Sequence, residues 1–102
     1  MVEVVSHHPV QKVVRITAKA GQEQELRDAL KILEADTREE PGCVEFAFFQ
    51  AISDEASFVL LEHFANEEAF MIHIQLPHTQ AFFKAQLVAV VHAVDVPSLG
   101  DK

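Results

Sequence analysis

Two neighbouring segments, 43–51 and 57–64, are apolar on both faces of the β-strands that their alternation predicts. In the first segment one face carries Val44, Phe46 and Phe48, and the other face is also largely apolar. Five residues separate the two segments, a length typical of a hairpin connection. Because a large exposed apolar patch is rare on a soluble monomer, neither face of this hairpin can stay in water.

Residues before the hairpin predict a strand and a helix. Alternating apolar residues favour a strand over 12–19. Apolar residues then recur at i, i+3, i+4 and i+7, which indicates an amphipathic helix over 22–40. Pro41 and Gly42 end this helix, since proline disfavours helical geometry in the preceding residue and glycine accepts the turn that follows.

Residues after the hairpin predict two helical stretches and a last strand. Asn66 is a candidate N-cap for a helix that begins at Glu67. Pro77 interrupts this helix, and a second stretch runs over 78–87. A β-branched, roughly alternating segment over 90–96 predicts the final strand.

The order strand, helix, strand, strand, helix, strand predicts an α+β domain with the ferredoxin-like βαββαβ fold over residues 12–96. Its four-stranded antiparallel sheet has helices on one face only. We therefore expect the bare apolar face to pack on the same face of a second copy, which gives a homodimer through sheet-to-sheet packing. Residues 1–11 and 97–102 are expected to form flexible tails.

Composition narrows the classes of partner. A chain of 102 residues has room for one domain, and its 16 acidic and 8 basic residues give a net charge of −8. This charge argues against nucleic acid and anionic membranes as partners, because both require a basic surface. The single cysteine, Cys43, cannot form an internal disulfide, which favours a cytoplasmic location.

The chain resembles the antibiotic biosynthesis monooxygenase family over nearly its whole length. The resemblance lies in the segments AKAGQEQEL, REEPGCVEF and LLEHFANEEAFMIHIQLPHTQAF. Its most specific part is a pattern of Glu62, Phe64, the acidic start of the following helix and His73. A proline–histidine pair that ends at His78 follows this pattern. The resemblance implies a dimeric α+β barrel with a pocket between the sheet and the helices.

The resemblance also implies a reaction class. Oxygenase members of the family oxidise quinol-like or polyketide aromatic substrates with O₂ and without a bound cofactor, because the deprotonated substrate itself donates electrons to oxygen. Two alternatives stay open: an isomerase of a small carbonyl compound, and a non-catalytic ligand-binding or stress-associated barrel. Phe64 and Leu61 stand where the family commonly has Trp and Tyr, which argues against haem cleavage.

His73 and Glu62 are the predicted catalytic residues. Imidazole suits proton removal at neutral pH, and His73 lies on the helix stripe expected to face the sheet. Glu62 shares a strand face with apolar residues and therefore needs a partner. It either orients His73 or acts as a base itself, or it pairs with Arg15, Lys19 or a backbone donor; His73 has the alternative of a buried structural histidine.

A flat apolar substrate is expected to contact Phe46, Phe64, Phe82 and His78. No cofactor is predicted. We also predict no metal site, because His73 and His78 lie on separate helical pieces and Glu62 is remote in sequence.

Overall fold

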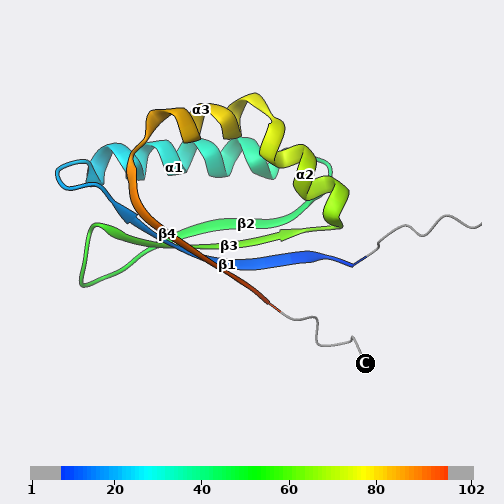
Figure 1. The fold of residues 1–102 in the computed structure, drawn as a ribbon, viewed down its shortest axis with the longest axis horizontal. Helices are drawn as coiled ribbons and strands as arrows, with labels where there is room; N and C mark the ends of the chain where they lie inside the picture. The colour runs from blue at the N-terminus through cyan, green and yellow to red at the C-terminus, as the bar shows by residue number, and fades with distance from the viewer. Residues whose placement is uncertain (1–7, 97–102) are drawn as a thin grey trace, which may run out of the picture.

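The structure is a computed structural model that describes residues 8–96. In chain order its elements are β1 (Val10–Ala18), α1 (Glu23–Arg38), β2 (Cys43–Gln50), β3 (Ser57–Phe64), α2 (Glu67–Gln75), α3 (Pro77–Ala85) and β4 (Val88–Asp95). This order confirms the predicted ferredoxin-like α+β fold (Figure 1). Within residues 8–96, no helix is long and apolar enough to cross a membrane.

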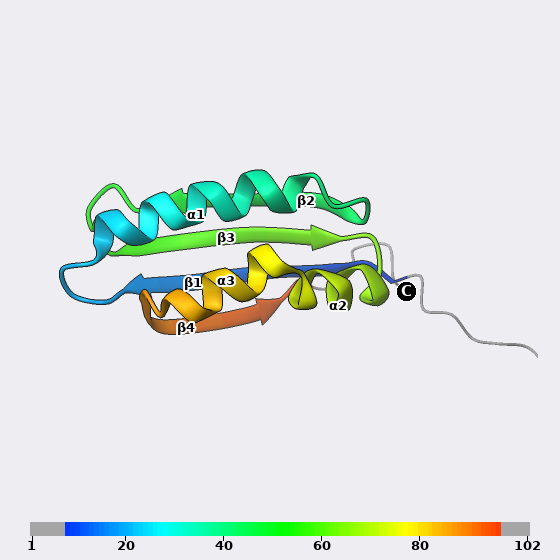
Figure 2. The same ribbon diagram turned by 90° about the horizontal axis from the view of Figure 1, so that it is seen from above.

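The sheet is antiparallel, with the strand order β2-β3-β1-β4. The central strand β1 pairs with both β3 and β4. All three described helices lie on the same face of the sheet (Figure 1), with α1 above β2 and β3, and α2 and α3 beside it (Figure 2). None of the helices in residues 8–96 covers the opposite face of the sheet, which we call the uncovered face.

Four element boundaries differ by two residues from the sequence expectation. One of them is the end of α1, which lies at Arg38 and not at residue 40. β1 begins at Val10, inside the segment assigned to a tail, because Val10 pairs with Phe64 of β3. α3 ends at Ala85, since Gln86 adopts a left-handed conformation with φ 53°. β4 consequently starts at Val88. Residues 1–7 and 97–102 of the expected tails lie outside the described residues.

The core lies between the helices and the covered face of the sheet. Alternate residues of β3 point into it, so Phe58, Leu60 and Phe64 are buried. From α1 the core takes an i, i+4, i+7 stripe of Leu26, Leu30 and Leu33, as the helical pattern predicted. These contacts fix α1 on the sheet, and with it the turn that follows.

The uncovered face of the sheet is apolar as well. Phe49 and Val94 are each about half exposed, and Leu61 in the central part of this face is 38% exposed. On the same face, Glu45 and Gln11 flank His63 on the neighbouring strands. The prediction that the hairpin is apolar on both sides holds for its middle part, whereas Glu45 and His63 make the end of this face polar. Val44, expected on one face with Phe46 and Phe48, is instead 59% exposed, because the register shifts between Cys43 and Glu45.

Candidate functional site

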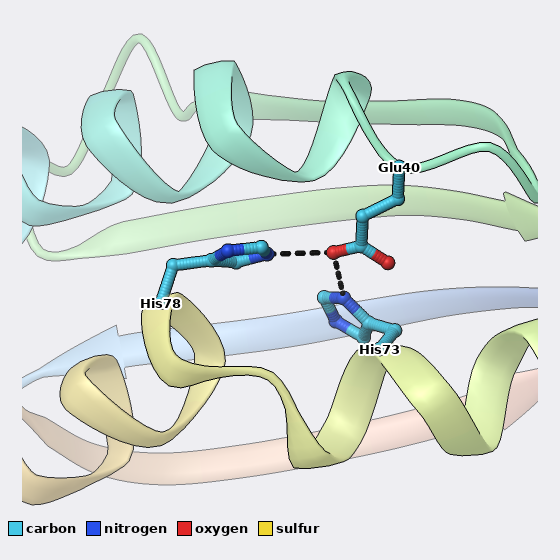
Figure 3. Close-up of side chains that lie close together, drawn as sticks. All are labelled: Glu40, His73 and His78. Carbon is cyan, nitrogen blue, oxygen red and sulfur yellow. Dashed lines mark hydrogen bonds and ion pairs between the residues drawn. The ribbon is translucent and has the colours of Figure 1, made fainter.

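Three side chains from separate segments converge on one carboxylate oxygen. Glu40 Oε2 lies 2.9 Å from His73 Nδ1 and 2.6 Å from His78 Nε2 (Figure 3). The Glu40 and His73 side chains are only 7% and 5% exposed, whereas that of His78 is 21% exposed. We call these three residues the Glu–His–His cluster.

The hydrogen bonds of the cluster define where the imidazole protons lie. An ionised carboxylate only accepts hydrogen bonds, so both contacting ring nitrogens donate to it. In the neutral imidazoles this leaves His73 Nε2 and His78 Nδ1 without a proton. Each histidine therefore keeps one nitrogen that can accept a proton from another molecule.

The turn after α1 places Glu40. The Glu40 N–H donates to the Thr37 carbonyl at 3.0 Å, and the Glu40 carbonyl accepts from the Cys43 N–H at 3.1 Å. Gly42 then lies against Ala69 of α2 so closely that a Cβ atom at position 42 would overlap the Ala69 Cβ atom. Because Ala69 and His73 are four residues apart on one face of α2, this close approach brings His73 to Glu40.

The step between α2 and α3 places His78. Leu76 is extended, with φ −72° and ψ 152°, and it serves as the last cap of α2 and the first cap of α3. Pro77 begins α3 at a position where its missing N–H costs no hydrogen bond. The chain thus turns sharply between the two histidines, whose ring centroids lie 6.2 Å apart.

Phenylalanine side chains surround the His73 ring. The ring centroid lies 4.8 Å from that of Phe64 and 5.3 Å from that of Phe46, and both phenylalanines are almost completely buried. Thr79 Oγ1 is 3.4 Å from His73 Nδ1. The space in which the sequence predicted substrate contacts of Phe46 and Phe64 is therefore filled by their own rings, and His73 is a packed member of the cluster.

An apolar groove opens on the outer side of the cluster, between α1 and α3. It has a volume of about 200 Å³ and is lined by Ala29, Ile32, Leu33, His78, Ala81, Phe82 and Ala85. His78 is the polar side chain of this lining. The structure thus brings two of the predicted substrate-binding residues, His78 and Phe82, to one groove.

Glu62 lies apart from the cluster. Its side chain points to the helix-covered face of β3 and it is 8% exposed, but among residues 8–96 it makes no hydrogen bond to His73. The carboxylate expected to orient His73 is replaced by Glu40. Burial raises the pKa of Glu62 to about 7, an effect that the charge of Lys12, its pairing partner in β1, opposes.

The cation beside Glu62 also differs from the sequence expectation of Arg15 or Lys19. Arg15 alternates to the uncovered face, because it is an odd number of residues from Lys12 along β1. Lys12 Nζ donates to Asp95 Oδ1 at 2.6 Å and lies 5.4 Å from the Phe70 ring centroid.

Cys43 lies close to the cluster but is not a reactive thiol. Burial, followed by the negative charge of Glu40, raises the pKa of the Cys43 thiol.

Sequence reasoning missed Glu40. Its signal is an acidic residue directly before the Pro41–Gly42 turn, a segment that supported the helix end and the family resemblance but was given no role in the site. Nothing local connects it with histidines 33 and 38 residues later. Only the docking of α2 on Gly42 brings them together.

Comparison with known sequences identifies a family match over most of the chain. The model of the family described as antibiotic biosynthesis monooxygenase matches residues 9–85. Uncharacterized protein YjcS of Bacillus subtilis (strain 168) is 35% identical over 66 residues, which are 65% of this chain and 63% of that protein. Uncharacterized protein sll1783 of Synechocystis sp. is 26% identical over 74 residues, or 72% of this chain and 50% of that protein. The chain thus spans between half and two thirds of these curated relatives.

Comparison with solved structures supports the same fold. The crystal structure of PA3566 from Pseudomonas aeruginosa has a TM-score of 0.84 and 26% identity, covering 89% of this chain and 94% of that one.

Proposed function

The chain belongs to the antibiotic biosynthesis monooxygenase family, and we propose that it oxidises a quinol-like or polyketide aromatic substrate with O₂ without a bound cofactor. The observation that carries this proposal is the hydrogen-bonded Glu–His–His cluster at the edge of the apolar groove. A buried carboxylate that holds an imidazole beside an apolar surface is suited to proton removal from an apolar acid.

His78 is the base in this proposal. It lines the groove, and its Nδ1 atom is the nitrogen left without a proton when Nε2–H donates to Glu40. Glu40 is the positioning residue, and it holds the ring in this tautomer. His73, the base expected from the sequence, acts through Glu40 as the second donor, since its own ring is enclosed by phenylalanines.

The chemistry requires only the substrate, oxygen and a base. Removal of a proton from an anthrone-like CH₂ group, or from its enol, gives an anion that donates electrons to O₂. One oxygen atom becomes bonded to the carbon as C=O. The other leaves as water with the two electrons and two protons of the CH₂ group. The apolar walls of the groove, including Phe82, would hold the flat rings and exclude water.

The groove also bears on the isomerase alternative. Among the described residues that line it there is no Lys or Arg, so a phosphorylated carbonyl compound would find no cation for its phosphate. The enclosed ring of His73 favours instead the non-catalytic alternative, in which the same groove binds an apolar ligand without turnover.

Oxygen uptake with a panel of quinols and anthrones tests the proposal. We expect enzyme-dependent uptake, and a decrease in kcat of about 10²- to 10⁴-fold in His78→Asn and Glu40→Gln. His8→Asn is the matched control, since His8 is an exposed histidine that does not line the groove. Ligand binding without oxygen uptake would establish the non-catalytic alternative, and equal rates in His78→Asn and wild type would remove His78 from the mechanism.

We also propose a homodimer through the uncovered face of the sheet. Phe49, Leu61, Val90 and Val94 expose apolar surface there, and burial of such surface is favourable by about 25 cal/mol per Å². Light scattering should give twice the mass of one chain at micromolar concentration. Leu61→Glu should give one chain mass, whereas a monomeric wild type would contradict the proposal. The unpaired Cys43 fits the cytoplasmic location that we propose.

A further inference from the structure

The Glu–His–His cluster brings together three atoms of types that bind transition metals. Glu40 Oε2, His73 Nδ1 and His78 Nε2 all lie within 4.8 Å of one another. We propose that this cluster binds one divalent transition-metal ion, with Zn²⁺ as the preferred ion, and that metal binding competes with the proton-transfer role of His78. Metal binding itself does not depend on the proposed reaction.

The donor set is that of an open zinc site. Two imidazoles and one carboxylate are a known set of protein ligands for zinc in catalytic sites, in which the fourth position holds water. Two nitrogen donors disfavour Mg²⁺ and Ca²⁺, which take oxygen ligands. The sequence argument against a metal site rested on the absence of a third nearby ligand, and Glu40 supplies that ligand.

The present distances are those of hydrogen bonds, so the metal must replace them. The carboxylate oxygen lies 2.6 and 2.9 Å from the two nitrogens. With metal–ligand bonds of about 2.0–2.1 Å, tetrahedral ligands lie about 3.3 Å apart, so the oxygen must withdraw slightly from both rings. Each coordinating nitrogen must also lose its proton, which moves to the opposite nitrogen of the ring. His78 Nδ1 then carries a hydrogen and can no longer accept a proton from a substrate.

Access to the cluster is on the His78 side. The side chains of Glu40 and His73 are less than a tenth exposed, whereas that of His78 is 21% exposed and lines the groove. An ion would therefore reach the cluster from the groove, and its fourth ligand would be a water molecule on that side. Because ligands must be unprotonated to bind metal, affinity should fall as the pH is lowered from 7.5 to 5.5.

Isothermal titration calorimetry of EDTA-treated, dialysed protein with ZnCl₂ tests the proposal. We expect one Zn²⁺ per chain with a Kd below 10⁻⁵ M, as an order of magnitude, and no binding of MgCl₂ at the same concentration. His78→Ala and Glu40→Gln should each weaken Zn²⁺ binding by about 10-fold or more, whereas His8→Ala should leave it unchanged. Circular dichroism establishes that each variant is folded.

A second measurement separates this cluster from adventitious surface histidines. Co²⁺ bound to wild type should give the visible absorption of a four-coordinate centre, and His78→Ala should abolish it. Failure of Zn²⁺ to bind wild type, or equal binding by wild type and His78→Ala, would overturn the proposal. Neither readout uses turnover, so the metal site can fail while the oxygenase proposal stands, and the reverse also holds.

Discussion

Two carboxylates on the helix-covered side of the sheet, Glu40 and Glu62, have opposite surroundings. The Glu40 side chain is 7% exposed and accepts hydrogen bonds from two imidazoles. Glu62 is also buried, but within residues 8–96 it has no hydrogen bond, and the charge of Lys12 on the neighbouring strand only partly offsets its loss of hydration. The comparison teaches that burial alone does not identify a functional acid. The hydrogen-bond donors that the fold places beside the carboxylate identify it.

The largest expected effect is on the free energy of unfolding. Replacement by leucine should lower it at Glu40 and raise it at Glu62. Glu40→Leu should destabilise the fold by about 2–4 kcal/mol, because two buried imidazoles lose their acceptor. Glu62→Leu should instead stabilise the fold at pH 8 by up to about 3 kcal/mol, because it removes a buried carboxylate that lacks a hydrogen bond. Urea unfolding of both variants at pH 8 measures the two free energies.

Glu39→Leu is the control for the first substitution, since Glu39 is the exposed neighbour of Glu40. Its effect should stay within about 0.5 kcal/mol. A loss of stability in both Glu40→Leu and Glu62→Leu would break the contrast between the two carboxylates.

The pH dependence of stability should come from Glu62. Its pKa of about 7 in the folded chain exceeds the ordinary value of 4.5, so the folded state holds the extra proton between these values. Its contribution is therefore most favourable below pH 4.5 and is lost as the pH rises to about 7. Relative to Glu62→Gln, wild type should gain up to about 3 kcal/mol between pH 8 and pH 4.5. Unfolding curves that run parallel for the two proteins would contradict the assignment.

A smaller effect is expected from the contact that brings His73 to Glu40. Gly42→Ala forces the turn away from Ala69 and should destabilise the fold by about 1–3 kcal/mol. It should also change the ¹⁵N shift of His73 Nδ1, because the hydrogen bond to Glu40 lengthens. Gly21→Ala has open space around its new methyl group but a φ of +82°, so it should cost about 1 kcal/mol without moving the His73 signal.

The smallest expected effects come from Asp95 and Lys12, which form an ion pair beside Glu62. Asp95 is 81% exposed, so Asp95→Asn should change stability by less than about 1 kcal/mol despite its 2.6 Å contact with Lys12. Lys12→Met should move the Glu62 titration to higher pH, since Lys12 lowers the pKa of this carboxyl. Urea unfolding of Asp95→Asn checks the first expectation, and NMR titration of the Glu62 side chain in Lys12→Met checks the second.

The fold was predictable because its signals are local. The apolar stripe of α1, the Asn66 cap and the alternation in β3 each depend on a few neighbouring residues, and each is present in the structure. The first residues of β1 and β4 were each misplaced by two positions. Pairing with β3 determines where β1 begins, and the left-handed Gln86 determines where β4 begins.

The site was only partly predictable because its contacts are distant in sequence. His73 and His78 were found from their helical positions and the family pattern, but their shared partner was not. The substrate contacts assigned to Phe46 and Phe64 depended on whether these rings line or fill the core, which alternation cannot distinguish. The roles of His73 and Glu62 in a reaction stay predictions.

The one-sided placement of the helices has a consequence for cooperativity. The helices lie on one side of the sheet (Figure 1), and the residues of the cluster and its groove belong to these helices and the turn after α1. A dimer joined through the uncovered face would therefore hold its two clusters on opposite outer sides. Two sheets about 10 Å apart would separate them. Each subunit should then work alone: ligand binding would follow a Hill coefficient of about 1, and a mixed dimer with one Glu40→Gln subunit would retain about half of the activity.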